Sequence, residues 1–226
     1  VWDGARFNLV YVDQDGKRVS VVSFDPVEQK TMILEYPEQL SISSRSVGEY
    51  KIGNLYTLGQ YKQQGGEFAR RKVQGFMRMP IMGYLVESSQ HGSVRSSLSR
   101  ALIRGIWHSE ESNLSRIDSL VLWRQLGRYN LSLIEEDELV RAGIIVRREN
   151  ETGSYGYMPE RLSQYVGKQF FDWGVGIEGA SVAVINESGI DGMGSDMAGF
   201  LTSMGLDVVV VRSGAQTRDR SRVVVK

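Results

Sequence analysis

The chain has 226 residues, of which 41% are hydrophobic and 24% charged, a composition typical of a folded globular protein with one sizeable core or two smaller ones. Its 27 basic and 27 acidic residues cancel, so net charge indicates no general affinity for nucleic acid or anionic lipid. Cysteine is absent, which excludes disulfides, thiolate metal sites and a cysteine nucleophile, and no apolar run in the sequence reaches membrane-spanning length.

The first part of the chain predicts strands followed by helices. Segments 7–12, 18–24 and 31–36 are rich in β-branched and aromatic residues and are closed by turn residues or proline. A short helix is expected at 50–58 and a longer one at 67–77. In the longer helix the inward side chains would be Phe68, Val73, Phe76 and Met77, and the solvated ones Arg70, Arg71 and Lys72.

The middle of the chain predicts a strand at 80–87 and helices at 93–106 and 115–129. Ser115 is the expected N-cap of the second helix, with Asp118 completing an approximate capping box. An apolar stripe of this helix is predicted to face the core, and it consists of Leu120, Val121, Trp123, Leu126 and Tyr129. Further expected elements are strands at 131–134 and 144–146, an exposed loop at 149–157, a helix at 159–172 and a link at 169–178.

Residues 182–211 predict a β-α-β unit, with a strand at 182–185, a glycine-rich turn, a helix ended by Gly205 and a strand at 207–211. The turn glycines follow GxxGxG instead of the dinucleotide-binding GxGxxG, which favours ordinary turn chemistry over a nucleotide site. Val182, Val184, Val208 and Val210 are expected on one face of the sheet, with Val209 and Val211 on the other. That other face would need a cover from the rest of the chain or from a partner.

This unit resembles the C-terminal domain found behind LytR-CpsA-Psr proteins of bacterial cell envelopes. The matching residues are Val184, Asn186, Gly189, Gly192, Gly205 and Val208. Earlier segments resemble the core of the same family. Its Ser-x-Asn-Pro and Ile-Pro-Arg-Asp motifs are similar to Ser23, Asp25-Pro26 and Tyr36-Pro37. Its Lys-Ile-Asn-x-Ala-Tyr-x-x-Gly motif is similar to residues 50–59. A family segment that runs through Ile-Pro-Ile-x-x-Tyr into a central strand is similar to residues 73–88.

The resemblance covers roughly residues 15–90 and 180–212. It implies an α/β protein with a degenerate LytR-CpsA-Psr-like α/β/α core over residues 1–173. A small C-terminal β-α-β domain, expected to be truncated, would follow over residues 174–226.

Active members of this family are phosphotransferases that move a glycopolymer from polyprenyl pyrophosphate to peptidoglycan. Such a site needs arginines for the pyrophosphate oxygens and acids for Mg²⁺. Where the family has an acid, an arginine and an acid, this sequence has Lys17, Glu38 and Gln39. The resemblance therefore implies no catalytic residues, no metal ligands and no cofactor. An active phosphotransferase that uses Mg²⁺ with rearranged ligands remains the alternative.

The expected role is thus non-catalytic binding or scaffolding in the cell envelope, with a cell-wall glycan or an envelope protein as partner and no nucleic acid. The candidate ligand-binding residues are Lys51, Tyr56, Asn186, Gly189 and Gly192. An extracytoplasmic location is implied, with membrane contact only through an upstream transmembrane helix absent from this chain. The oligomeric state stays open, and the glycine spacing disfavours a third class, an intracellular nucleotide-binding module.

Other possible constellations do not favour catalysis. His91 and His108 are the only histidines and lie in different expected elements, so neither a zinc site nor a Ser-His-Asp triad is predicted. Adjacent carboxylates at 110–111 and 135–136 are expected to face solvent.

Overall fold

A computed structural model describes residues 5–15, 18–44, 48–88, 92–107, 112–148, 153–170 and 172–224. The expectations for Lys17, His91, His108, Glu110 and Glu111 lie outside these residues.

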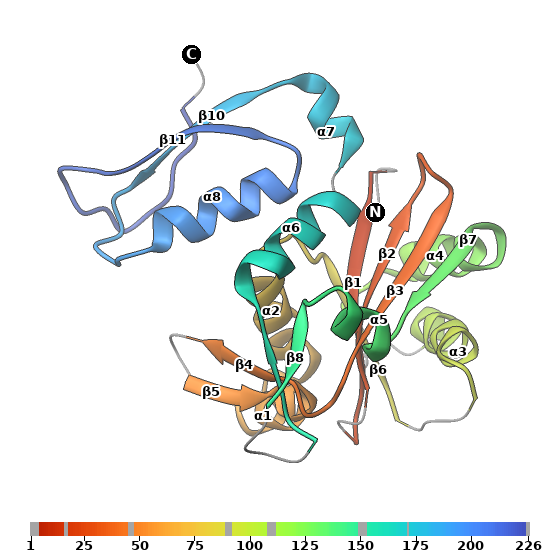
Figure 1. The fold of residues 1–226 in the computed structure, drawn as a ribbon. Helices are drawn as coiled ribbons and strands as arrows, with labels where there is room; N and C mark the ends of the chain where they lie inside the picture. The colour runs from red at the N-terminus through yellow and green to blue at the C-terminus, as the bar shows by residue number, and fades with distance from the viewer. Residues whose placement is uncertain are drawn as a thin grey trace.

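A five-stranded mixed sheet forms the centre of the molecule (Figure 1). Its strands are β1 (Phe7–Asp13), β2 (Val19–Asp25), β3 (Lys30–Tyr36), β6 (Gly83–Glu87) and β7 (Asn130–Ile134). The spatial order is β6-β1-β2-β3-β7. Strand β2 is antiparallel to both neighbours, whereas β6 is parallel to β1 and β7 to β3. The carboxyl ends of β1, β3, β6 and β7 therefore share one edge of the sheet.

Helices cover both faces of this sheet. One face carries α1 (Leu55–Tyr61), α2 (Gly65–Met77), α5 (Glu136–Arg141) and α6 (Pro159–Gln169). The other carries α3 (Val94–Trp107) and α4 (Arg116–Arg128). Because side chains alternate along a strand, each strand contributes to both hydrophobic cores. The expected α/β/α layering is confirmed.

Two small hairpins flank the first layer of helices. Strand β4 (Ser41–Ser44) pairs with β5 (Gly48–Lys51), and β8 (Ile145–Arg147) pairs with β9 (Tyr155–Tyr157). The helix expected at 50–58 instead begins as the short 3₁₀ turn η1 (Ile52–Asn54) followed by α1. The prediction of an exposed loop at 149–157 is wrong for residues 155–157, which form β9. Pairing with β8 imposes an extended conformation there, and the local polarity does not indicate it.

The prediction for helix α4 is correct in its position along the chain and wrong in the face that it buries. The side chain of Ser115 accepts a hydrogen bond from the Asp118 amide, which confirms the capping box. The row that enters the core consists of Ser119, Leu122 and Leu126, while Leu120 and Trp123 are 50% and 40% exposed. Packing against the sheet thus selects a narrower row than the apolar pattern alone suggests.

The C-terminal unit is the expected β-α-β, formed by β10 (Ser181–Asn186), α8 (Met193–Ser203) and β11 (Asp207–Ser213). The parallel strands make a separate two-stranded sheet. The link expected at 169–178 contains an additional short helix, α7 (Trp173–Glu178).

The expected assignment of sheet faces is corrected by a register shift in this unit. Val182 pairs with Val208, but Val184 pairs with Val211, because the ladder slips by one residue between them. Val211, and not Val210, therefore shares a face with Val184. Val209, Val210 and Val211 are 57%, 43% and 47% exposed, so both faces of the second strand stay partly accessible.

Arg78 links the C-terminal unit to the end of α2. This residue ends α2 in a left-handed conformation, with φ 52°. Its carbonyl accepts a hydrogen bond of 2.8 Å from Ser203 Oγ, and its Nη2 lies 2.9 Å from Asp196 Oδ1. A Cβ atom at Gly199 would lie only 3.3 Å from the Arg78 Cδ, so the side chain runs along α8. Helix α8 consequently docks beside α6, as Figure 1 shows. Within the described part of the chain, no helix combines the length and apolarity needed to cross a membrane.

Candidate functional site

Two buried carboxylates lie at the carboxyl-terminal edge of the central sheet. Asp13 ends β1 and Glu87 ends β6, and the two residues are partners in the parallel ladder. Each is 1% exposed. In α/β sheets, ligands commonly bind outside the carboxyl ends of strands, so this edge is the candidate functional site.

Each of the two carboxylates has one bonded oxygen and one free oxygen. Asp13 Oδ1 accepts a hydrogen bond of 3.0 Å from the Asp15 amide, and Glu87 Oε1 lies 3.1 Å from Arg104 Nη1. Asp13 Oδ2 and Glu87 Oε2 are buried and have no hydrogen-bond partner within the described residues. Burying such atoms is costly, and a site of this kind therefore calls for a functional explanation.

Polar and charged side chains surround this pair, and most of them are bound to one another. Burial and the charge of Glu87 raise the pKa of Tyr11 to about 12, so its phenol stays protonated, and Ser97 hydrogen-bonds to it. The neighbouring Arg18 is paired with Glu35 through an Nε to Oε1 contact of 2.7 Å, while its Nη1 is buried and has no hydrogen-bond partner within the described residues. Within the described part of the chain, no group of three or more His, Cys, Asp or Glu side chains could hold a metal ion.

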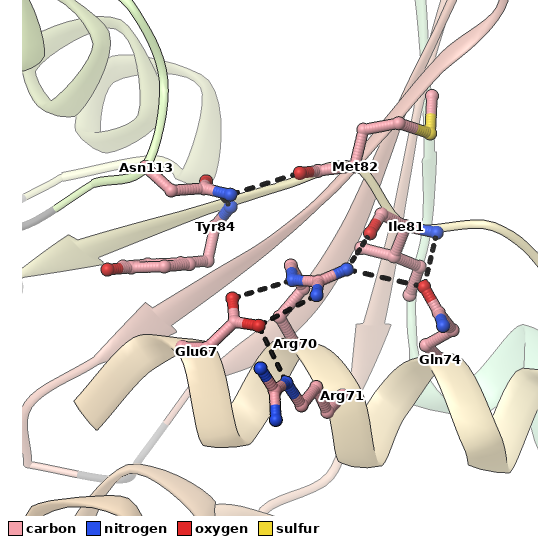
Figure 2. A network of polar contacts seen from close by, with 8 residues as sticks. All are labelled: Glu67, Arg70, Arg71, Gln74, Ile81, Met82, Tyr84 and Asn113. Atoms are coloured by element: carbon pink, nitrogen blue, oxygen red, sulfur yellow. Dashed lines mark hydrogen bonds and ion pairs between the residues drawn. The ribbon is translucent and has the colours of Figure 1, made fainter. Parts of the chain in front are cut away.

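A polar network on α2 fixes the segment that leads into β6 (Figure 2). Glu67 accepts hydrogen bonds from Arg70 Nε (2.8 Å) and Nη2 (2.7 Å) and from Arg71 Nε (2.7 Å). Arg70 Nη1 in turn donates to the Ile81 carbonyl at 2.5 Å, and the Ile81 amide donates to Gln74 Oε1 at 3.1 Å. Arg70 is only 19% exposed, so the expectation that it lies on a solvated face is wrong.

The other side of the same segment is held by Asn113, in the segment that precedes α4. Asn113 Nδ2 donates to the Met82 carbonyl at 3.1 Å, and the Tyr84 amide donates to Asn113 Oδ1 at 2.8 Å. Figure 2 shows these contacts on the side of the strand away from Arg70. Strand β6 is thus pinned from both sides, which sets the register that brings Glu87 beside Asp13.

Two positions at which the resemblance predicts a substitution, Glu38 and Gln39, face solvent after β3. Glu38 and Gln39 are both exposed, and the Glu38 carbonyl accepts a hydrogen bond of 3.0 Å from the Gly53 amide. Water screens an exposed carboxylate, so the repulsion that Glu38 would exert on a pyrophosphate oxygen is weaker than for a partly buried group.

Lys51 and Tyr56 are held by local partners. Lys51 Nζ donates to Ser154 Oγ at 2.5 Å and to Ser41 Oγ at 3.1 Å, which ties β5 to the segment before β9. The hydroxyl of Tyr56 accepts a hydrogen bond of 2.5 Å from Gln60 Nε2 one turn along α1.

The other three candidate residues lie together in the turn after β10. Asn186 Oδ1 accepts a hydrogen bond of 3.1 Å from the Ser188 amide, and its Nδ2 donates to the Ile190 carbonyl at 2.9 Å. Gly189 and Gly192 have φ values of 72° and 78°, a region that favours glycine. The side chain of Asn186 closes the turn, an arrangement that ordinary turn chemistry explains. The structure does not join this turn with Lys51 and Tyr56 into one site.

Sequence reasoning missed the two buried carboxylates. Asp13 directly precedes the hairpin turn, and Glu87 ends the strand expected at 80–87, so a signal was present. The positions of these two acids could not be recognised as one site without knowing that β1 and β6 are parallel neighbours.

Comparison with known proteins gives a likeness of fold. No family model matches the sequence, and no curated protein matches it. Among solved structures, Bacillus subtilis TagU aligns with 71% of this chain and 94% of its own at 10% identity, with a TM-score of 0.50. The LytR-CPS2A-psr family protein YwtF (TagT) with bound octaprenyl pyrophosphate lipid aligns with 73% of this chain and 89% of its own at 11% identity, also with a TM-score of 0.50. YwtF is likewise a Bacillus subtilis protein.

Proposed function

We propose, from a core with the LytR-CpsA-Psr fold, that this protein is a non-catalytic binding or scaffolding protein of the bacterial cell envelope. Its ligand in this proposal is a cell-wall glycan. The solved structure of YwtF, which has this fold, contains octaprenyl pyrophosphate. The fold alone fixes neither activity nor ligand, so the argument depends on the residues at the sheet edge.

The observation that carries the proposal is the pairing of the arginines beside the two buried carboxylates. Arg18 is bound to Glu35 at 2.7 Å, and Arg104 is 3.1 Å from Glu87. Pyrophosphate transfer requires cations that neutralise charge on the phosphoryl oxygens. A ligand phosphate at this edge would compete with Glu35 and Glu87 for these arginines, which lowers the positive charge available to the phosphoryl oxygens.

A second candidate function, an active phosphotransferase, is favoured by the two buried carboxylates themselves. Mg²⁺ in phosphoryl-transfer sites is commonly held by one or two carboxylates together with water and substrate phosphates. The unpartnered oxygens of Asp13 and Glu87 fit that donor set, and a bound ion would supply charge neutralisation. Their 1% exposure means that substrate could reach them only after the edge opens.

The two candidate functions predict different results in an assay of phosphate release. Purified protein is incubated with Mg²⁺ and octaprenyl pyrophosphate, and released phosphate is measured. We expect no release above the rate without protein. Metal-dependent release that is abolished by Asp13→Asn and retained by Asp15→Asn, a change at an exposed neighbour, would establish the phosphotransferase and refute the non-catalytic role.

The binding half of the proposal has its own test. The protein should co-sediment with purified cell-wall sacculi, and soluble wall glycan should compete it off. Absence of co-sedimentation at physiological ionic strength would refute a glycan as the ligand.

A further inference from the structure

The outer side of α3 and α4 exposes large apolar side chains. Five of them define the α3–α4 face: Ile103 (41% exposed), Trp107 (73%), Ile117 (57%), Leu120 (50%) and Trp123 (40%). Single exposed apolar residues are ordinary on protein surfaces, but a continuous group containing two tryptophans marks an interaction surface.

Contacts between the two helices show that this group is continuous. Trp123 Nε1 donates to Ser99 Oγ at 3.1 Å, and a Cβ atom at Gly105 would lie 3.1 Å from Ser119 Oγ. These two contacts set an antiparallel register in which Ile103 falls between them. The exposed apolar residues of α3 therefore lie beside those of α4 and form one strip along the helix pair.

The same helices concentrate positive charge. They contain six arginines, namely Arg95, Arg100, Arg104, Arg116, Arg124 and Arg128, against one acid, Asp118. The whole chain has no net charge, so the remainder carries the balancing negative charge. Arg116, Arg124 and Arg128 are exposed and form no ion pair with any residue that the structure describes. The connection at 108–111, which contains two glutamates, lies outside the described residues.

We infer that the α3–α4 face docks on the surface of a membrane that contains anionic phospholipid. Tryptophan rings favour the boundary between head groups and acyl chains, and arginines around them can bind lipid phosphates. A protein interface would also use tryptophan and arginine, but three exposed arginines without an acidic partner among the described residues favour a surface with dense negative charge, which anionic phospholipid supplies. Figure 1 places the C-terminal unit beyond the opposite layer of helices, so docking would leave it accessible.

This inference does not rest on the proposed function. It depends on the apolar strip and on Arg116, Arg124 and Arg128, and not on Arg104, which is bound to Glu87, so it holds whether the sheet edge is catalytic or silent. Its failure would leave the phosphate-release and sacculus assays unaffected.

The test is flotation of the purified protein with vesicles. We expect binding to mixed phosphatidylglycerol–phosphatidylcholine vesicles, weak binding to pure phosphatidylcholine, and loss of binding as salt rises. The triple variant Arg116→Glu, Arg124→Glu, Arg128→Glu should weaken binding by about a hundredfold or more, since each basic residue near an anionic surface contributes about fivefold. Trp107→Ser should also weaken it. Circular dichroism should show both variants folded, because these side chains are exposed.

Matched controls change equally exposed residues elsewhere. The triple variant Arg161→Glu, Arg212→Glu, Arg220→Glu alters the net charge by the same amount, and Ile177→Ser removes another exposed apolar side chain, one that is 82% exposed. Both controls should bind as the unmodified protein does. Equal binding to the two kinds of vesicle, or equal loss in the control triple variant, would overturn the inference. So would a dimer in light scattering that Trp107→Ser dissociates, since a second copy would then occupy the face.

Discussion

Glu67 should stabilise the protein in a strongly pH-dependent way. Hydrogen bonds from Arg70, with a further contribution from Arg71, lower the pKa of this carboxyl from 4.5 to about 2, even though partial burial opposes the shift. A folded-state pKa below the unfolded value means that the contribution is fully present above about pH 4.5. It is lost as pH falls toward 2.

The size of the effect follows from the shift and the exposure of the partners. Each pKa unit corresponds to about 1.4 kcal/mol, which sets an upper limit of about 3 kcal/mol for Glu67. Glu67 is 27% exposed and Arg71 is 63% exposed, so solvent screening reduces the expected value to about 1–2 kcal/mol. The Glu67→Gln variant keeps the size of the side chain and removes its charge, and should lose that amount at neutral pH.

The measurement is urea denaturation of the unmodified protein and of Glu67→Gln between pH 7 and pH 3, because urea does not screen charge as guanidinium does. The difference in unfolding free energy should be constant from pH 7 to about pH 5 and shrink below that. Glu28→Gln, at an exposed carboxylate, is the control and should show no comparable loss. A difference that stays unchanged down to pH 3 would refute the electrostatic reasoning and leave a purely steric role for Glu67.

Three further outcomes test the packing. Gly66→Ala should destabilise the protein by about 1–3 kcal/mol in thermal or urea unfolding, because the new Cβ would lie 2.3 Å from the ring of Tyr84; an unchanged stability would show that the ring can move freely. Hydrogen exchange should be faster in residues 182–211 than in 19–36, since the C-terminal sheet has two strands and an exposed outer face, and equal protection would contradict this. Limited proteolysis should cut first within residues 147–179, and a first cut inside the central sheet would argue for another domain organisation.

Local sequence determined most of the individual elements of this protein. The helix start at Ser115 follows from a side chain that satisfies nearby backbone amides, and the end of α8 follows from Gly205, whose φ of 99° suits glycine. Likewise, short apolar runs, several of them β-branched, were enough to locate the strands of the central sheet and of the C-terminal unit. These signals depend on neighbours a few residues apart, so they can be read along the chain.

Only the tertiary structure decided which of these elements meet. The pairing of Asp13 with Glu87 joins residues far apart in sequence, and the ladder slip beside Val209 depends on how two strands align. Packing against the sheet also determines which row of α4 is buried, and Trp123 lies outside that row and is exposed. The net charge of the whole chain also gives no indication that arginines are concentrated on α3 and α4. A sum over the chain contains no positions, whereas binding depends on where the charges and apolar side chains lie together in space.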